Sequence, residues 1–224
     1  KHKSPSSHMT YFYLIPSWFL GFDSALELLF GIITLIIAGM SAYVYKITKE
    51  NNIKHFSVAF FLMSASYLIW ATINISVVHT LAQGVPLLSL ENLSHIWRLG
   101  LYGYIALFTA GLVTLVYATL NIKRSDIYYL MVGLPLIGIA GSLQKLIIFR
   151  IVAVFLLSFI VYHYLLEWID KKNPKTLIVL FAFVFLLASN AGLIFSPFYT
   201  SPYVVSHIIE LGAYTLFTFS LVRT

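Results

Sequence analysis

The sequence predicts an all-α integral membrane protein that folds as a bundle of seven transmembrane helices. Hydrophobic residues make up 60% of the 224 residues and charged residues 10%, whereas about a quarter of the residues in a soluble domain are charged. The apolar residues form seven stretches, each of about the 20 residues that a helix needs to cross a bilayer. Cationic residues are concentrated in alternate gaps between these stretches. Together these features exclude a water-soluble domain and predict a lipid bilayer as the surroundings.

The chain is expected to form one domain. Residues 1–9 have no hydrophobic periodicity and resemble an expression-tag remnant followed by an initiator Met. Residues 10–224 suffice for a single seven-helix transmembrane domain with short loops. The predicted helices cover residues 24–46, 56–79, 93–120, 126–142, 146–169, 175–195 and 203–222.

Charged residues delimit these helices in chain order. Lys46, Lys49 and Lys54 separate the first from the second, Lys123 and Arg124 the third from the fourth, Lys171, Lys172 and Lys175 the fifth from the sixth, and Arg223 follows the seventh. All of these lie on one side, and the other side holds Lys145 and Arg150 at the turn after the fourth helix. The positive-inside rule then places the N-terminus outside and the C-terminus in the cytoplasm of a multi-pass cell-membrane protein. The net charge of +6 is assigned to loops that face anionic lipid, and no nucleic acid is expected as a partner.

Glycines mark places where the helices are expected to depart from regular packing. Gly133, Pro135, Gly138 and Gly141 lower the helical propensity of the fourth helix, so we expect it to be kinked or closely packed. Gly100 and Gly103 of the third helix are likewise expected at close helix contacts.

Several chemistries can be set aside by residue type. The chain has no cysteine, which excludes disulfides, thiolate metal ligands and thiol catalysis. It contains no Gly-x-Ser-x-Gly or Walker sequence and no paired intramembrane aspartates. The seventh helix has no lysine for a retinal Schiff base. No residue is therefore assigned a catalytic role, and an enzyme is the less favoured class.

Polar residues of five predicted helices fall in the outer half of the membrane. On the seventh helix Tyr203, His207, Glu210 and Tyr214 recur at helical spacing and share one face. Because ionisable side chains in the hydrocarbon region normally face the bundle interior, we predict an outward-facing ligand pocket. Its candidate residues are Arg98, Glu210, Tyr102, Tyr203, Tyr214, Asn74, Asn190 and Glu27.

Structural explanations compete with this interpretation. Arg98 and Glu210 have opposite charges at similar predicted depth, so an ion pair between the third and seventh helices would satisfy both. Glu27 follows Ser24 at the spacing of a capping box, and Asp23 suits the start of a helix. Capping is the favoured interpretation of Glu27.

Histidines allow a metal site in the same region. His207 and Glu210 lie on one helical face, while His95 and His79 flank the same outer loop, so these four residues form a candidate ligand set for zinc or copper. Haem b ranks lower, since it would require two histidines facing each other at matching depth.

Together these features favour a receptor- or sensor-type membrane protein that binds a small ligand or metal ion, with output through a membrane or cytoplasmic partner protein. Transport is less favoured, because the inner half of the predicted bundle offers mainly Ser41, Thr109, Thr114 and Thr119. A metal- or haem-dependent membrane enzyme or redox subunit, and a structural membrane subunit or transporter, remain as alternatives.

Overall fold

The computed structural model describes residues 19–82, 87–121 and 124–222, and these residues form seven helices with no strand. Their bounds are Leu20–Thr48 (α1), Asn51–Ala82 (α2), Leu87–Thr119 (α3), Ser125–Gly141 (α4), Lys145–Lys171 (α5), Pro174–Ile194 (α6) and Thr200–Val222 (α7). The predicted all-α bundle is confirmed. The proposed tag, Lys123 and Arg223 lie outside the described residues.

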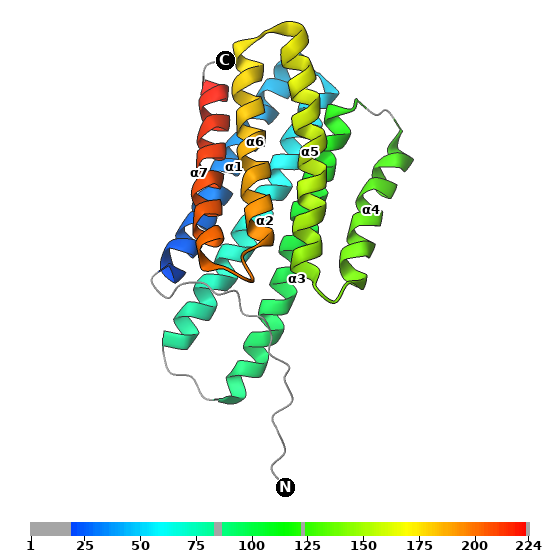
Figure 1. The fold of residues 1–224 in the computed structure, drawn as a ribbon. Helices are drawn as coiled ribbons and strands as arrows, with labels where there is room; N and C mark the ends of the chain where they lie inside the picture. The colour runs from blue at the N-terminus through cyan, green and yellow to red at the C-terminus, as the bar shows by residue number, and fades with distance from the viewer. Residues whose placement is uncertain (1–18, 83–86, 122–123, 223–224) are drawn as a thin grey trace.

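Consecutive helices run antiparallel, so α1, α3, α5 and α7 begin at one end of the bundle (Figure 1). We call this the N-terminal end and the other the C-terminal end. α1 packs against α2 and α7, α7 against α6, and α5 against α3 and α6, while α4 contacts only α3 and α5 among the described helices. Helix α4 thus lies at the periphery, and α1 closes the bundle by meeting α7.

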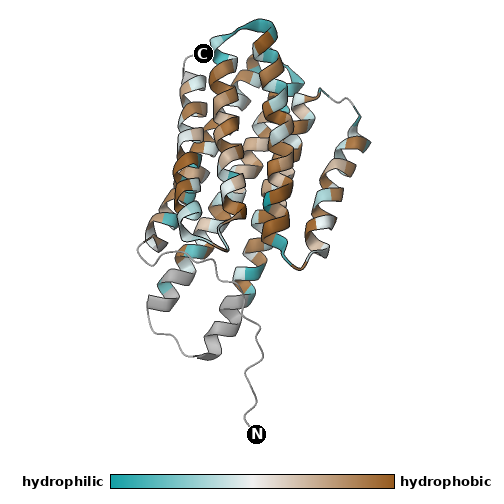
Figure 2. Ribbon diagram, in the orientation of Figure 1, coloured by the Kyte–Doolittle hydropathy of each residue, from teal (hydrophilic) through white to brown (hydrophobic). Residues whose placement is uncertain are grey.

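Within the described part of the chain, five helical segments are long and apolar enough to cross a membrane: Gly21–Thr48, Asn51–Ser76, His95–Thr119, Lys145–Lys171 and Pro174–Ile194. Figure 2 shows hydrophobic residues along the middle of these helices and hydrophilic ones toward their ends. Helix α4 is apolar but has 17 residues, and the apolar sequence of α7 is interrupted by His207 and Glu210. The chain is therefore a polytopic helical membrane protein.

The interior of the C-terminal half is filled by aromatic rings. Phe60 and Phe183 both pack against Phe217, with ring centroids 5.4 and 4.8 Å apart. All three side chains are buried. The hydroxyl of Thr114 in this half bonds to the main-chain oxygen of Ala110 on its own helix. This half therefore has an apolar interior.

Glycine positions only partly match the expected close contacts. A Cβ atom at Gly100 would lie 1.7 Å from Cδ1 of Ile73, so α2 and α3 do approach closely there. By contrast, a Cβ at Gly103, Gly138 or Gly141 would have no atom of another described helix within 4 Å. The close-packing prediction is correct for Gly100 and wrong for these three glycines, because α4 is peripheral and Gly103 points away from its neighbours.

The described lysines between helices gather at the C-terminal end of the bundle. Lys46 and Lys49 end α1, Lys54 lies in the first turn of α2, and Lys171, Lys172 and Lys175 surround the α5–α6 turn. All six side chains are exposed. Lys145 and Arg150 begin α5 at the opposite end. The charge asymmetry of the sequence is thus also an asymmetry between the two ends of the bundle.

Candidate functional site

A cluster of buried polar side chains occupies the N-terminal half of the bundle. We define the buried polar cluster as Asp23 and Glu27 of α1, Tyr67 and Asn74 of α2, Arg150 of α5, Ser189 and Asn190 of α6, and Tyr203, His207, Glu210 and Tyr214 of α7. Most of these side chains are buried, and Arg150 and Asn74 are partly buried. The helices that contribute them begin or end at the same side of the bundle (Figure 1).

Asp23, Glu27 and His207 converge at the contact between α1 and α7. Each offers one potential metal-ligating atom, and these atoms lie within 4.8 Å of one another. Asp23 is 2% exposed, Glu27 4% and His207 5%. The Nε2 atom of His207 lies 3.2 Å from Oδ1 of Asp23. We refer to these three residues as the acid–histidine triad.

A hydrogen bond at Nδ1 fixes the orientation of the His207 ring. Nδ1 of His207 lies 3.0 Å from the main-chain oxygen of Tyr203. A carbonyl oxygen can only accept a hydrogen bond, so Nδ1 carries the proton and donates it. Nε2 then faces Oδ1 of Asp23 at 3.2 Å, and because both atoms are acceptors this approach is favourable only with a second ring proton or a cation on Nε2. A metal ion in place of that proton would be ligated by the lone pair of Nε2.

Two further hydrogen bonds hold the triad carboxylates. The hydroxyl of Tyr203 donates to Oδ1 of Asp23 over 2.7 Å. The side-chain amide of Asn74 donates to Oε2 of Glu27 over 2.8 Å. Hydrogen bonding to a carboxylate in an apolar interior is needed to offset its loss of hydration. The two acids of α1 are thus fixed by residues of α7 and α2.

Glu210 forms a second group deeper along α7. The hydroxyl of Tyr67 donates to Oε1 of Glu210 and lies 2.8 Å from the hydroxyl of Tyr214. Ser189 approaches Oε2 of Glu210 at 3.5 Å. Tyr67 and Tyr214 are buried, so the carboxylate joins α7 to α2 and α6 inside the bundle.

Arg150 brings a cation to the same region from α5. Its Nη1 donates to Oδ1 of Asn190 over 3.0 Å, and its guanidinium lies 5.0 Å from the centre of the Phe149 ring. The sequence-based pocket included Asn190 and omitted Arg150. The structure therefore supplies a partly buried cation that the sequence analysis assigned to an outer turn.

The predicted ion pair between Arg98 and Glu210 does not form between these two described side chains. Arg98 is exposed on α3, whereas Glu210 is 3% exposed and bonded to Tyr67. The physical reason is the arrangement of the helices, since α3 packs against α2, α4 and α5 while α7 packs against α1 and α6. Tyr102 of α3 is also exposed.

The predicted capping box is wrong as well. Helix α1 begins at Leu20 with Phe19 as its N-cap, so Ser24 and Glu27 lie inside the helix. Glu27 instead accepts a hydrogen bond from Asn74. Because the apolar residues before Asp23 extend the helix, Glu27 lies within α1 and not at its cap, whereas Asp23 lies in the first turn, as predicted.

The potential metal ligands that converge in the structure differ from the four predicted from the sequence. His207 joins Asp23 and Glu27, and the triad formed by the described residues includes neither Glu210, His95 nor His79. His79 near the end of α2 and His95 in the first half of α3 are exposed. Of the candidate pocket residues, Glu27, Asn74, Asn190, Tyr203, Glu210 and Tyr214 belong to the buried polar cluster, whereas Arg98 and Tyr102 do not.

Asp23, Tyr67 and Arg150 belong to the buried polar cluster but not to the pocket predicted from the sequence. Asp23 and Glu27 are four residues apart and Tyr67 and Asn74 seven apart, spacings that put each pair on one helical face. That signal was present in the sequence. For Arg150 no comparable signal exists, because its inward orientation depends on how α5 packs against α6.

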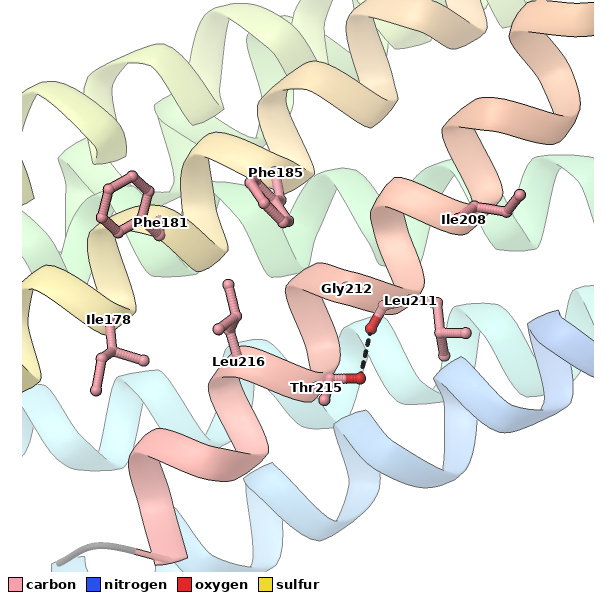
Figure 3. A pocket seen from close by; sticks show the side chains of 8 residues that line it. All are labelled: Ile178, Phe181, Phe185, Ile208, Leu211, Gly212, Thr215 and Leu216. Carbon is pink, nitrogen blue, oxygen red and sulfur yellow. Dashed lines mark hydrogen bonds between the residues drawn. The ribbon is translucent and has the colours of Figure 1, made fainter.

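An open groove on the surface between α6 and α7 is apolar and separate from the polar cluster. It is lined by Ile178, Phe181, Phe185, Ile208, Leu211, Gly212, Thr215 and Leu216 (Figure 3). The hydroxyl of Thr215 is bonded to the main-chain oxygen of Leu211 at 2.8 Å and therefore adds little polarity to the groove. The expected polar pocket is thus not this groove, and the polar side chains pack against one another inside the bundle.

The buried polar cluster could act chemically as a cation site or as a proton-binding network. Two carboxylates and an imidazole together suit a divalent ion of borderline character. The same three groups could instead form a protonated histidine paired with Asp23. Comparisons with protein-family models, with curated proteins and with solved structures found no match for this chain.

Proposed function

We propose that this membrane protein is of receptor or sensor type and binds a divalent metal ion at the acid–histidine triad, Asp23, Glu27 and His207. The observation that carries the proposal is the convergence of three buried ligand atoms from α1 and α7 within 4.8 Å. Ionisable residues inside a membrane are costly and are usually retained for a task. In this proposal residues 10–224 form a single transmembrane domain that contains the metal site.

Charge supports a cation at this position. Asp23 and Glu27 are two carboxylates on one face of α1, and both are buried. Two carboxylates that share a site repel each other unless a proton or a cation intervenes. A divalent ion would neutralise both at once, and the lone pair on Nε2 of His207 would complete a mixed oxygen and nitrogen ligand set. Zinc fits such a set best, and copper is the next candidate.

Haem b fits the described residues less well. Bis-histidine ligation would need a second buried histidine opposite His207, and His79 and His95 are exposed. A metal ion alone requires only the groups that already converge.

A receptor- or sensor-type role is favoured over transport by what lies beneath the cluster. Phe60, Phe183 and Phe217 fill the bundle on the C-terminal side of Tyr214. An ion path would need polar groups through that half. We propose that the N-terminal end faces outward in the cell membrane, since the exposed lysines gather at the other end. A membrane or cytoplasmic partner protein would then bind the C-terminal end of the bundle.

Metal content tests the proposal directly. The protein is purified in detergent without a polyhistidine tag, its metal content is measured by mass spectrometry, and zinc affinity is measured by competition with a chromophoric chelator. We expect one bound zinc ion per chain in the wild-type protein and much less than one in His207→Ala. His163→Ala is the matched control, because His163 lies on α5 far from the triad and packs against Tyr164. Wild-type protein that takes up no divalent metal would refute the proposal.

A metal-dependent membrane enzyme is the second candidate, favoured by the number of ligands. Three protein ligands leave a coordination position for water, as in catalytic zinc sites. Glu210, close along α7, would then be a general-base candidate. Hydrolysis of an ester or amide substrate panel by the zinc-loaded protein, abolished in both His207→Ala and Glu210→Gln, would favour this candidate over the sensor.

A further inference from the structure

Tyr203 contacts both helices of the triad by two different groups. Its hydroxyl donates to Oδ1 of Asp23 on α1 over 2.7 Å. Its main-chain oxygen, 3.0 Å from Nδ1, accepts the proton of His207 on α7. One residue therefore fixes a carboxylate through its side chain and an imidazole through its backbone.

The ring of Tyr203 is itself held in place. It is 7% exposed and packs edge-on against Phe19, with ring centroids 5.9 Å apart. Phe19 also packs against the His207 ring at 6.1 Å. A phenol fixed in this way presents its hydroxyl to Asp23 with little freedom to turn elsewhere, which is the property required of a group that orients a metal ligand.

We propose that Tyr203 is the positioning residue of the metal site, which sets the orientation of Asp23 and the tautomer of His207. The proposal rests on the metal-binding function proposed above. Tyr203 does not ligate the ion. Its hydroxyl restrains one oxygen of Asp23, and its carbonyl keeps the Nδ1 proton of His207 in place so that Nε2 is available as a ligand.

The two contacts can be separated experimentally. Tyr203→Phe removes the hydroxyl but retains the ring and the main-chain carbonyl, so only the contact with Asp23 is lost. Loss of a group that orients a metal ligand typically lowers metal affinity about 10- to 100-fold. Tyr117→Phe is the matched control, since Tyr117 is also 7% exposed and lies near the end of α3 in the opposite half of the bundle.

The experiment measures zinc affinity and the visible absorption spectrum of the Co²⁺-substituted protein for wild type, Tyr203→Phe and Tyr117→Phe. The expected result is a drop of about 10- to 100-fold in affinity and a shifted Co²⁺ spectrum in Tyr203→Phe alone. The spectrum reports the ligand geometry, which a merely structural tyrosine would leave unchanged. If Tyr203→Phe does not fold without metal, the same two measurements are made on protein expressed and purified with zinc or Co²⁺ present, because a bound ion stabilises the folded state.

The outcomes separate the two proposals. Wild-type protein that binds neither zinc nor Co²⁺ overturns the metal-binding function itself. Wild-type binding with an unchanged affinity and spectrum in Tyr203→Phe overturns only the positioning role. Equal losses in Tyr203→Phe and Tyr117→Phe also overturn it, because the effect would then not depend on the contact with Asp23.

Discussion

Tyr67→Phe tests whether the buried carboxylate of Glu210 depends on its tyrosine partner. The substitution removes one oxygen, which donates to Oε1 of Glu210 and lies 2.8 Å from the hydroxyl of Tyr214. After it, the remaining hydrogen-bond partner of the carboxylate among the described side chains is Ser189 at 3.5 Å, too long for a strong bond. The variant therefore leaves a 3% exposed carboxylate with its main donor gone.

The expected loss follows from the kind of bond. A hydrogen bond to a charged group contributes about 1.5–3 kcal/mol, and a neutral one about 0.5–1.5 kcal/mol. Side-chain hydrogen bonds between membrane helices average about 0.6 kcal/mol, with a maximum of about 1.7 kcal/mol. Because Tyr67 loses one bond of each kind, and because bonds between membrane helices fall at the low end of the general range, we expect the free energy of unfolding to fall by about 1–3 kcal/mol. Tyr214→Phe loses only the neutral bond, so it should cost about 1 kcal/mol.

The assay is equilibrium unfolding in mixed micelles by titration with sodium dodecyl sulfate, followed by circular dichroism. Tyr43→Phe is the control, because Tyr43 is 67% exposed on α1 and should change stability by less than about 0.5 kcal/mol. If Tyr67→Phe were no more destabilising than Tyr43→Phe, the hydrogen bond to Glu210 would not stabilise the bundle, and the reasoning would be refuted.

Three other predictions concern packing, orientation and binding. A Cβ at Gly100 meets Cδ1 of Ile73 at 1.7 Å while the position at Gly103 is open. The end of the Ile73 side chain must therefore shift, and Gly100→Ala should be less stable than Gly103→Ala by about 0.5–1.5 kcal/mol in the same titration; equal stabilities would contradict it. Since the chain has no cysteine, single cysteines at Leu143 and Lys172 report orientation: an impermeant thiol reagent should label Leu143→Cys in intact cells and Lys172→Cys only after permeabilisation, and the reverse would invert the proposed topology. Zinc should raise the Tm of the wild-type protein in proportion to the logarithm of its concentration, with no rise in His207→Ala; an equal rise in both would exclude the triad as the origin.

Much of the fold could be predicted from the sequence because it depends on local properties. Apolar stretches of about 20 residues separated by charged gaps specify helices that cross a bilayer. All seven predicted helices form, and five of those described are long and apolar enough to cross a membrane. The boundaries of α1 and α2 differ from the prediction. The two helices begin at Leu20 and Asn51, whereas the charge and capping patterns predicted starts at residues 24 and 56. Polar residues are therefore poor indicators of a helix end when the residues around them can still form a helical turn.

The site could be predicted only in part. The depth of a residue in the membrane follows from its position in its own helix, but its contacts depend on which helices pack against that helix. The stripe on α7 correctly indicated that His207 and Glu210 face inward. Their partners depend on which helices meet α7. Helix α7 packs against α1 and α6, which brings Asp23 to His207, and the long side chain of Tyr67 reaches Glu210 from α2, so Arg98 of α3 is not a partner. An odd number of helices closing into a bundle permits several such arrangements, and the sequence pattern does not distinguish them.

The contact between α1 and α7 also links ligand binding to the assembly of the bundle. Tyr203 and Asp23 are 180 residues apart in the chain, so the triad exists only when the first and last helices are together. A ligand that binds only this closed state stabilises it by about 2.7 kcal/mol at a concentration one hundred times its Kd. A protonated His207 paired with Asp23 would close the same contact without any metal, and the stability would then be independent of zinc. The dependence of stability on zinc concentration therefore distinguishes a metal site from a structural ion pair, even though both are built from the same residues.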